Sequence, residues 1–211
     1  MITAPDKLIF LPGASGNTQF WCPVAGRLNT AAQKIHVGWP GFGDTPYSPG
    51  VASLDDLVAR VSAEIEGPSA LVAQSMGGIV AVRVALEHPE LITHLVLSVT
   101  SGGVDMADLG AQDWREAFAA ENPTLPRWFV DDRTDLTPRL GELRMPVLLI
   151  WGGADPISPP CVGQRLAQLI PQAQLHVFPD GGHDVGSTHS SAVAGLIDEH
   201  LASGDCRRAA C

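Results

Sequence analysis

Six short apolar runs, each ending in a turn and followed by a longer amphipathic stretch, constrain the fold of this chain more than any other feature. The runs are rich in leucine and β-branched residues and are apolar on both faces, which is typical of parallel strands covered by helices on both sides. They are KLIFLPG (7–13), KIHVGWPG (34–41), SALVAQS (69–75), HLVLSVTSGG (94–103), PVLLIWGGAD (146–155) and QLHVFPDGGH (174–183). Strands that alternate with helices predict an α/β fold with a doubly wound, mostly parallel six-stranded sheet.

Two of the stretches between the runs have helical periodicity. In residues 53–67 the apolar side chains fall on one face, Ser53 is suited to cap the helix and Gly67 to end it. Residues 76–88 are apolar nearly all round, except for Arg83 and Glu87. These two are four residues apart, so they share one polar edge of a helix that is otherwise buried against the sheet.

Residues 104–144 interrupt this alternation, because no strand pattern appears between the fourth and fifth runs. The segment 105–123 has a helical pattern, and 125–143 predicts a bend and a second short helix. We expect this insertion to form a small helical cap over the strand ends of a single domain, 1–204. Residues 205–211 are expected to be a disordered tail.

Aromatic side chains are concentrated in the expected cap, where they could line a substrate pocket or cover the sheet. They are Trp114, Phe118, Trp128 and Phe129.

The charge balance argues against several classes of partner. The chain has 13 Lys and Arg against 23 Asp and Glu, a net charge of −10, so no excess of cations is available for nucleic acid or an anionic membrane surface. No apolar run approaches the roughly 18 residues of a membrane span, and the first residues do not resemble a signal peptide. We therefore expect a cytoplasmic protein without membrane insertion. The four cysteines (22, 161, 206 and 211) have no spacing typical of a disulfide framework or a thiolate metal site.

The loops after the strands are where chemistry is expected, because ligands of doubly wound sheets bind beyond the carboxyl ends of the strands. Ser75 lies where a predicted strand meets a helix, with the small residues Ala73 and Gly77 on either side. A serine at such a sharp turn is held above the sheet with its hydroxyl accessible. Taken alone, it could equally be a small residue at the start of a helix.

A base and an acid in suitable positions favour the catalytic interpretation. Asp155 ends the fifth run and His183 ends the sixth. A serine hydroxyl becomes a strong nucleophile when a histidine takes its proton and an acid orients that histidine. Weaker candidates for the acid or the base, which lie off a strand end or beside His183, are Asp131, Asp132, Asp135, Asp180, Asp184 and His189.

These motifs resemble those of the α/β-hydrolase superfamily. The resemblance is carried by AQSMGG (73–78), GGAD (152–155) with Pro159 four residues on, and Gly182-His183. LPGASGNTQFW (11–21) resembles the oxyanion loop, and GWPGFGDTPYSP (38–49) the segment after the next strand. The resemblance to the superfamily covers the chain from Lys7 to about Leu201. The first two strands of the family are missing from this pattern, so a reduced sheet of six is expected.

Two positions depart from the family pattern. Ala73 stands where a glycine is usual two residues before the nucleophile, as in the small bacterial lipases that the core resembles. Pro12 replaces the common histidine at the start of the oxyanion loop, and proline has no side-chain donor to support that loop.

The resemblance implies a catalytic triad of Ser75, Asp155 and His183. The backbone N–H groups of Ala14 and Met76 would form the oxyanion hole. No cofactor is expected: GASGNT lacks the lysine of a phosphate-binding loop, GFGDTP lacks the third glycine of a dinucleotide turn, and no metal-binding spacing is present.

The predicted function is therefore a serine hydrolase that cleaves a small or medium carboxylic ester, or a thioester, through an acyl-enzyme. One alternative is a carbon–carbon bond hydrolase with the same triad. Another is a ligand-binding or signalling protein of this fold with negligible turnover. The expected partner is a small-molecule ester or thioester, and the oligomeric state stays open.

Overall fold

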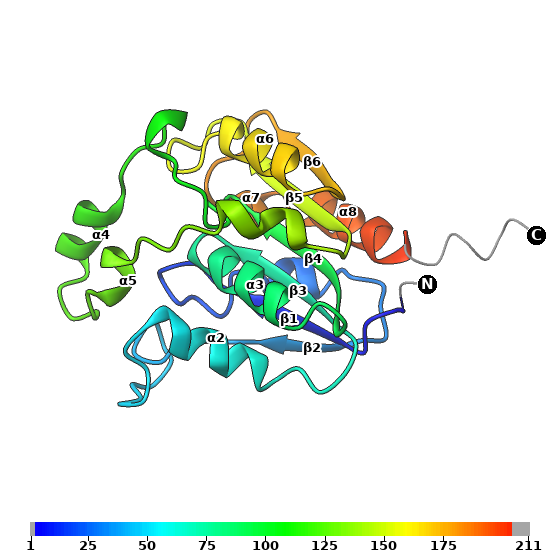
Figure 1. Ribbon diagram of the computed structural model, residues 1–211, viewed down its shortest axis with the longest axis horizontal. Helices are drawn as coiled ribbons and strands as arrows, with labels where there is room; N and C mark the ends of the chain where they lie inside the picture. Colours follow the sequence, from blue (N-terminus) through cyan, green and yellow to red (C-terminus); the bar gives the residue numbers. More distant parts are fainter. Residues whose placement is uncertain (1–2, 204–211) are drawn as a thin grey trace, which may run out of the picture.

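The computed structural model describes residues 3–203, which form a six-stranded sheet with helices on both faces (Figure 1). All neighbouring strands are parallel, and their order across the sheet is β2-β1-β3-β4-β5-β6. The strands are β1 (Lys7–Leu11), β2 (Gln33–His36), β3 (Ser69–Gln74), β4 (Ile92–Ser98), β5 (Val147–Gly152) and β6 (Ala173–Phe178). The predicted doubly wound sheet of six strands is confirmed, and every strand lies within or next to one of the six apolar runs.

The helices form a layer on each face of the sheet. Helices α2, α3 and α6 lie in front of it in Figure 1, whereas α1 packs against α8 on the other face. Their bounds, with that of α7, are α1 (Cys22–Ala25), α2 (Leu54–Ser62), α3 (Met76–Glu87), α6 (Pro160–Leu169), α7 (Val185–Thr188) and α8 (Ser190–Ala202). Among residues 3–203, no helix combines the length and the apolar character needed to cross a membrane.

Burial differs between the inner and outer strands. Every residue of β3, β4 and β5 is buried, because helices cover both faces of these inner strands. The edge strands β2 and β6 are only partly buried, and exposed residues alternate along β6. Ser75 and Asp155 of the site described below therefore follow fully buried inner strands, whereas His183 follows the edge strand β6.

The ends of two helices show how local sequence sets their length. Ser53 caps α2 as predicted, its hydroxyl accepting from the N–H of Asp56 at 3.3 Å. However, α2 ends at Ser62, ahead of the predicted stop at Gly67. In α3 the side chain of Arg83 pairs with Glu87 at 3.7 Å and also bonds to Asp55 of α2, so the polar edge of α3 joins the two helices.

The segment 104–144 contains no strand and folds into short pieces: η1 (Ala107–Leu109), α4 (Arg115–Glu121), α5 (Trp128–Asp131) and η2 (Thr137–Glu142). The helix predicted over 105–123 is broken at Gly110, whose φ of 69° ends η1 in the left-handed conformation. Helices α4 and α5 lie beyond one end of the sheet (Figure 1). The division into one domain with a cap stays a prediction, and the tail at 205–211 lies outside the described residues.

Candidate active site

Ser75 occupies the sharp turn between β3 and α3. Its φ of 51° and ψ of −123° form a backbone conformation that residues other than glycine rarely adopt. Two hydrogen bonds hold the turn: the N–H of Ser75 donates to the carbonyl of Ser98 at 3.0 Å, and the N–H of Gly78 donates to the carbonyl of Ser75 at 2.9 Å. The hydroxyl is thereby presented beyond the carboxyl end of β3.

The small residues around Ser75 permit close backbone approaches. A Cβ atom at Gly77 would overlap the carbonyl oxygen of Pro12, and one at Gly78 would overlap the side chain of Thr100. Gly77 thus lets the first turn of α3 approach the loop after β1, and Gly78 lets it approach the end of β4. This explains physically why residues without a side chain follow the serine.

Asp155 lies in the turn after β5, and its side chain is fully buried. One carboxylate oxygen accepts from the N–H of Ile157 at 2.8 Å, and the other lies 2.8 Å from Nδ1 of His183. A buried carboxylate is costly unless it is hydrogen-bonded, and these two contacts supply its partners and fix its orientation.

His183 connects the acid to the serine. Its Nε2 lies 3.0 Å from Oγ of Ser75, while Nδ1 faces Asp155. Its carbonyl accepts from Nε2 of Gln74 at 3.3 Å, which ties the histidine loop to the end of β3. The structure therefore brings together Ser75, Asp155 and His183, three residues that end different strands.

The weaker candidates for the acid and the base make their hydrogen bonds and ion pairs with other residues. His189 contacts Asp180 at 3.4 Å and packs against Phe178, away from Ser75. Asp132 and Asp135 accept hydrogen bonds from Thr134 and Thr137 in their own turns. None of the three candidate aspartates, Asp131, Asp132 and Asp135, is in hydrogen-bond contact with His183 in the described part of the chain.

The loop after β1 lies beside Ser75. Residues 13–16 form a turn in which the N–H of Gly16 donates to the carbonyl of Gly13 at 3.0 Å. The buried indole of Trp39 donates from Nε1 to the carbonyls of Pro12 and Gly13 at 3.2 and 3.1 Å. Trp39 thus gives this loop the side-chain donor that Pro12 cannot provide.

Ala14 and Met76 place their backbone amides on the two sides of the serine, one in this loop and one at the start of α3. Neither N–H donates to another residue within 3–203. The first amides of a helix have no acceptor within the helix, so the amide of Met76 is free to bind an external oxygen.

Two cavities open directly onto Ser75. One of about 160 Å³ is lined by residues 13–15, Ser75, Trp114, Phe118 and His183, among others. The other, of about 40 Å³, is lined by Met106, Phe129 and Arg115, among others. Ser75 therefore borders both spaces.

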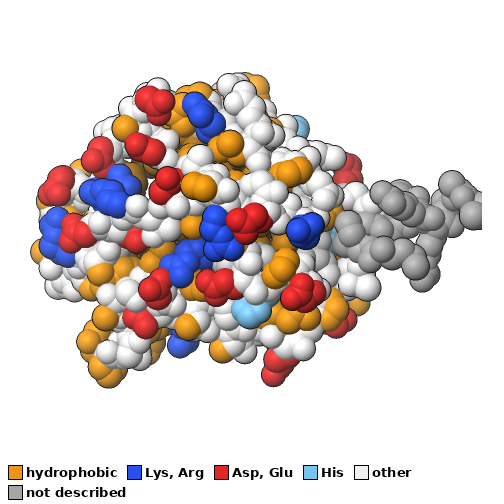
Figure 2. All heavy atoms as spheres, viewed as in Figure 1, with side chains coloured by type: hydrophobic (Ala, Val, Ile, Leu, Met, Phe, Trp, Pro, Cys, Tyr) orange, Lys and Arg blue, Asp and Glu red, His pale blue; other side chains and the backbone are white. Residues whose placement is uncertain are grey.

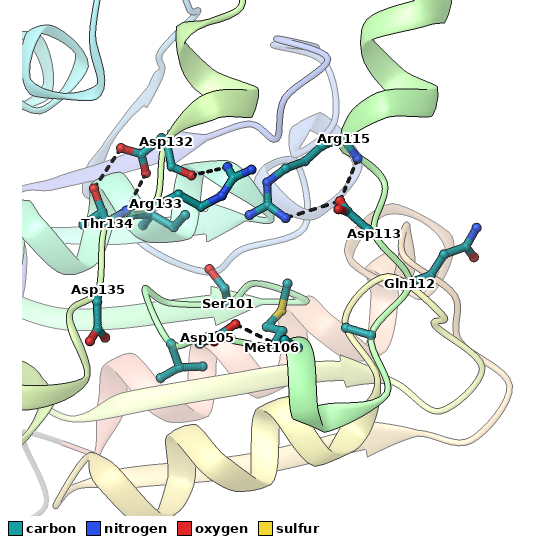
Figure 3. A pocket seen from close by; sticks show the side chains of 14 residues that line it. Ser101, Asp105, Met106, Gln112, Asp113, Arg115, Asp132, Arg133, Thr134 and Asp135 are labelled. Carbon is teal, nitrogen blue, oxygen red and sulfur yellow. Dashed lines mark hydrogen bonds and ion pairs between the residues drawn. The ribbon is translucent and has the colours of Figure 1, made fainter.

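A third and larger cavity of about 500 Å³ adjoins the small one (Figure 3). The two cavities share the wall residues Ile79, Met106 and Arg115, as well as Ser101 and Asp132. This cavity has more charged residues in its wall than the spaces at Ser75, namely two arginines, Arg115 and Arg133, and four aspartates.

The predicted pocket aromatics have different positions. Trp114 lines both cavities at Ser75, Phe118 the larger of these two and Phe129 the smaller. Trp128 lines none of the three cavities within the described chain, and its ring packs on Phe42 and Phe129.

Within residues 3–203, no group of three or more His, Cys, Asp and Glu side chains is arranged to hold a metal ion.

Comparison with known proteins identifies the family of this chain. The model described as "Alpha/beta hydrolase family" matches residues 8–133, and a second, described as "alpha/beta hydrolase fold", matches residues 127–190. The chain belongs to the alpha/beta hydrolase family. The parallel six-stranded sheet with flanking helices is thus that of an alpha/beta hydrolase.

Curated relatives of this alpha/beta hydrolase have different activities. A 2-hydroxy-6-oxononadienedioate/2-hydroxy-6-oxononatrienedioate hydrolase of Paraburkholderia phymatum is 30% identical over an alignment that covers 90% of this chain and 83% of the relative. A pimeloyl-(acyl-carrier protein) methyl ester esterase of Neisseria meningitidis is 23% identical and covers 95% of both chains.

Solved structures share the fold. A thermophilic esterase from Thermogutta terrifontis superposes with a TM-score of 0.79 at 23% identity, over 95% of this chain and 91% of that chain. A meta-cleavage product hydrolase from Pseudomonas fluorescens IP01 gives a TM-score of 0.74 at 21% identity, over 96% of this chain and 93% of that chain.

Sequence reasoning missed two residues of this alpha/beta hydrolase site. Gln74 bonds to the loop of His183, and Trp39 bonds to the loop of Ala14. A polar side chain at the end of a buried strand was a usable signal for Gln74. Nothing in the sequence indicates that the indole of Trp39 reaches a loop 26 residues away.

Proposed function

We propose that this alpha/beta hydrolase is a serine hydrolase that cleaves a small or medium carboxylic ester, or a thioester, through an acyl-enzyme. The observation that carries the proposal is the unbroken chain of contacts from Asp155 through His183 to Ser75, at 2.8 and 3.0 Å. Both distances are within hydrogen-bond range, as a nucleophile, a base and an orienting acid require.

The contacts of His183 support one arrangement of protons in the resting site. Nδ1 of His183 donates to the carboxylate of Asp155, which leaves Nε2 as the acceptor for the hydroxyl of Ser75. Asp155 also accepts from the N–H of Ile157, which fixes the orientation of its carboxylate. It therefore holds the imidazole in the tautomer that can take a proton from serine.

Acylation follows from this arrangement. Oγ of Ser75 bonds to the carbonyl carbon of the ester as its proton passes to Nε2 of His183, and the carbonyl electron pair moves onto oxygen. The amides of Ala14 and Met76 donate to that oxyanion; each such donor contributes about 3 kcal/mol of transition-state stabilisation. The bond to the leaving alcohol or thiol then breaks, and the leaving group takes the proton from His183.

Deacylation repeats these steps with water. His183 takes a proton from a water molecule, whose oxygen attacks the acyl carbon. The second oxyanion collapses by breaking the bond to Ser75, which regains its proton from His183. The acid product leaves, and the site returns to its resting protonation.

The size of the substrate is argued from the cavities at Ser75. The apolar side, with Trp114 and Phe118, has a volume of about 160 Å³, which is below the roughly 300–1,000 Å³ of pockets for drug-sized ligands. A short or medium group on this side of the ester fits such a space better than a long one.

Active-site labelling tests the proposal. A fluorophosphonate should form a single adduct on Ser75, and Ser75→Ala should lose turnover of 4-nitrophenyl esters from acetate to octanoate while remaining folded. Labelling at another residue, or no labelling, contradicts it. A saturable thermal shift with a ligand but no hydrolysis would instead favour a ligand-binding protein.

A carbon–carbon bond hydrolase with the same triad is the second candidate. The relatives named as 2-hydroxy-6-oxononadienedioate/2-hydroxy-6-oxononatrienedioate hydrolases favour it, as do the arginines in the neighbouring cavity. The two functions differ in the bond that breaks. Turnover of a vinylogous 1,5-diketone acid without turnover of any ester would support the second.

A further inference from the structure

The large cavity beside the site contains two arginines whose guanidinium groups point toward one another (Figure 3). Arg115 begins α4 and Arg133 lies in the loop after α5, so different parts of the 104–144 segment supply the two arginines. Arginine stays protonated throughout the pH range of proteins. Two positive charges directed at one space make that space suited to an anion.

Most of the hydrogen-bond donors of these arginines are unused. Arg133 donates from Nη1 to the carbonyls of Val130 and Asp132, both at 2.8 Å, and its other nitrogens have no partner within the described chain. Arg115 makes one long bond to Asp113 at 3.4 Å, and its Nε is buried without any partner among residues 3–203. A buried donor without an acceptor is costly, so an oxygen ligand would stabilise this arrangement.

Four aspartates also line the cavity, and three of them, Asp105, Asp132 and Asp135, accept hydrogen bonds within their own turns. Asp105 accepts from the N–H of Ala107 at 3.0 Å, and Asp132 accepts from the N–H and hydroxyl of Thr134. Figure 3 shows the carboxylate of Asp132 directed toward Thr134 and away from the two guanidinium groups. Only Asp113 pairs with one of the arginines, and its side chain is 69% exposed.

Arg115 is held between this cavity and the serine. Its guanidinium carbon lies 5.7 Å from the centre of the Trp114 ring, a cation–π distance, and Trp114 lines both cavities at Ser75. Because Arg115 is in the wall of the small cavity as well as the large one, a substrate bound over Ser75 could extend past it.

The distribution of charge over the surface of the protein offers no general attraction for an anion. On the face seen in Figure 2, basic and acidic side chains are interspersed and form no single positive patch, and the net charge of the chain is −10. Recognition of an anion must therefore come from the local pair of arginines. The aspartates nearby make a monoanion a better fit than a dianionic phosphate.

We propose that this cavity binds a carboxylate at the far end of the substrate, so that the preferred substrate is a half-ester of a dicarboxylic acid. Arg115 and Arg133 would hold that carboxylate while the ester carbonyl lies at Ser75. The inference rests on the proposed function, because the ester must react at Ser75.

Paired substrates test the substrate class. The mono-4-nitrophenyl esters of linear dicarboxylic acids from succinic to suberic are compared with the corresponding methyl 4-nitrophenyl diesters, which lack the charge. One chain length should be preferred as the half-ester by about tenfold or more in kcat/KM, the range expected of charge-assisted hydrogen bonds. Equal values for half-ester and diester at every length overturn the proposal, and preference for a phosphate-ended ester overturns the choice of carboxylate.

Two variants and a matched control locate the carboxylate. Arg115→Gln and Arg133→Gln should each reduce the ratio of half-ester to diester kcat/KM about tenfold, mainly through KM. Arg127→Gln removes the same charge from the same segment, but Arg127 is 58% exposed, pairs with Glu116 and Asp131 and lines none of the three cavities. It should keep the ratio. An unchanged ratio in both cavity variants overturns the proposal.

Binding measured without turnover separates this inference from the proposed function. Titration calorimetry of Ser75→Ala with the monomethyl ester of the preferred diacid should show binding that weakens about tenfold when Arg133→Gln is added. Binding of this kind, with no turnover of any ester by the wild-type protein, would contradict the proposed function but support the anion site. Ester turnover through Ser75, without any binding that depends on Arg133, would support the proposed function but contradict the anion site.

Discussion

The indole Nε1 of Trp39 lies 3.1 Å from the carbonyl oxygen of Gly13 and also donates to the carbonyl of Pro12 at 3.2 Å. This contact holds the loop whose next residue, Ala14, presents its amide beside Ser75. Trp39 is completely buried, so its donor has no alternative partner in solvent. We infer that Trp39 is a positioning residue for the oxyanion hole.

Trp39→Phe should lower kcat for 4-nitrophenyl esters by about tenfold with little change in KM, because the loop loses the donor that fixes the amide of Ala14. Trp21→Phe is the matched control. Trp21 is also buried and donates through Nε1, at 3.0 Å, to the carbonyl of Leu11 on β1. Both variants should lose about 1–3 kcal/mol of stability, but only Trp39→Phe should lower kcat. Equal effects of both variants on kcat would show a purely structural role for Trp39.

Asp155→Asn should reduce kcat by about 10⁴-fold with little loss of folding, because an amide would favour the wrong tautomer of His183. The measurement is steady-state hydrolysis of a 4-nitrophenyl ester, with circular dichroism as the check on folding. Asp180→Asn is the control. Asp180 contacts the other histidine of this region, His189, and its change should keep kcat within a factor of about two.

The three groups should also act as a unit. Ser75→Ala, His183→Gln and the double variant should all retain a similar residual rate, because removing one member already disables the relay. Additive losses in the double variant, or full activity in Asp155→Asn, would contradict the proposed mechanism.

Much of the fold was predictable because parallel strands leave a strong signal. The inner strands β3, β4 and β5 are buried on both faces, so their sequences are apolar throughout and are easy to recognise. The sequence also predicts the edge strands β2 and β6, but it does not predict their partial exposure. The burial of an edge strand depends on residues that pack against it from elsewhere in the chain, and these are not visible in its local sequence. The sequence predicts that α2 ends at Gly67, but the helix ends at Ser62, because the chain turns directly after that residue.

The 104–144 segment was the least predictable part of the chain. Its apolar residues support helical turns, but Gly110 and the short length of α4 and α5 leave each piece dependent on tertiary contacts. Ser75, Asp155 and His183 could be named because they end strands, where the fold gathers side chains. The partners of Trp39 and Arg115 could not be named, because these contacts join loops whose paths the sequence does not specify.

Gly77→Ala and Gly195→Ala form a matched pair within helices. Gly195, in α8, has no atom within 4 Å of an added Cβ, so alanine there should stabilise the protein by up to about 1 kcal/mol. At Gly77 the same change places the Cβ against the carbonyl oxygen of Pro12 and should instead destabilise it by about 1–3 kcal/mol. Urea unfolding measures both. A stabilising effect at Gly77 would show that the turn after Ser75 does not require the close approach.

Two buried histidines lie in contact on the side of the sheet that faces α8. His94 on β4 and His200 on α8 have ring centres 5.2 Å apart and are 1% and 7% exposed. Burial lowers the pKa of each from 6.5 to about 4, and in His200 the neighbouring charge of His94 adds to the effect. Each imidazole is therefore neutral in the folded protein at pH values where it is already protonated in the unfolded chain.

Stability should consequently fall as the pH decreases from about 6.5 to about 4, and this contribution should level off below pH 4. Between these values the unfolded state binds more protons than the folded state, so the free energy of unfolding decreases with decreasing pH. The two histidines together should account for a few kcal/mol of that loss. His94→Gln should remove about one proton from the uptake on unfolding at pH 5, measured as the slope of the free energy of unfolding against pH. His176→Gln, which removes a histidine at an exposed position of β6, is the control variant. If the slope of His94→Gln equals that of the wild type, the pair does not titrate as its burial requires.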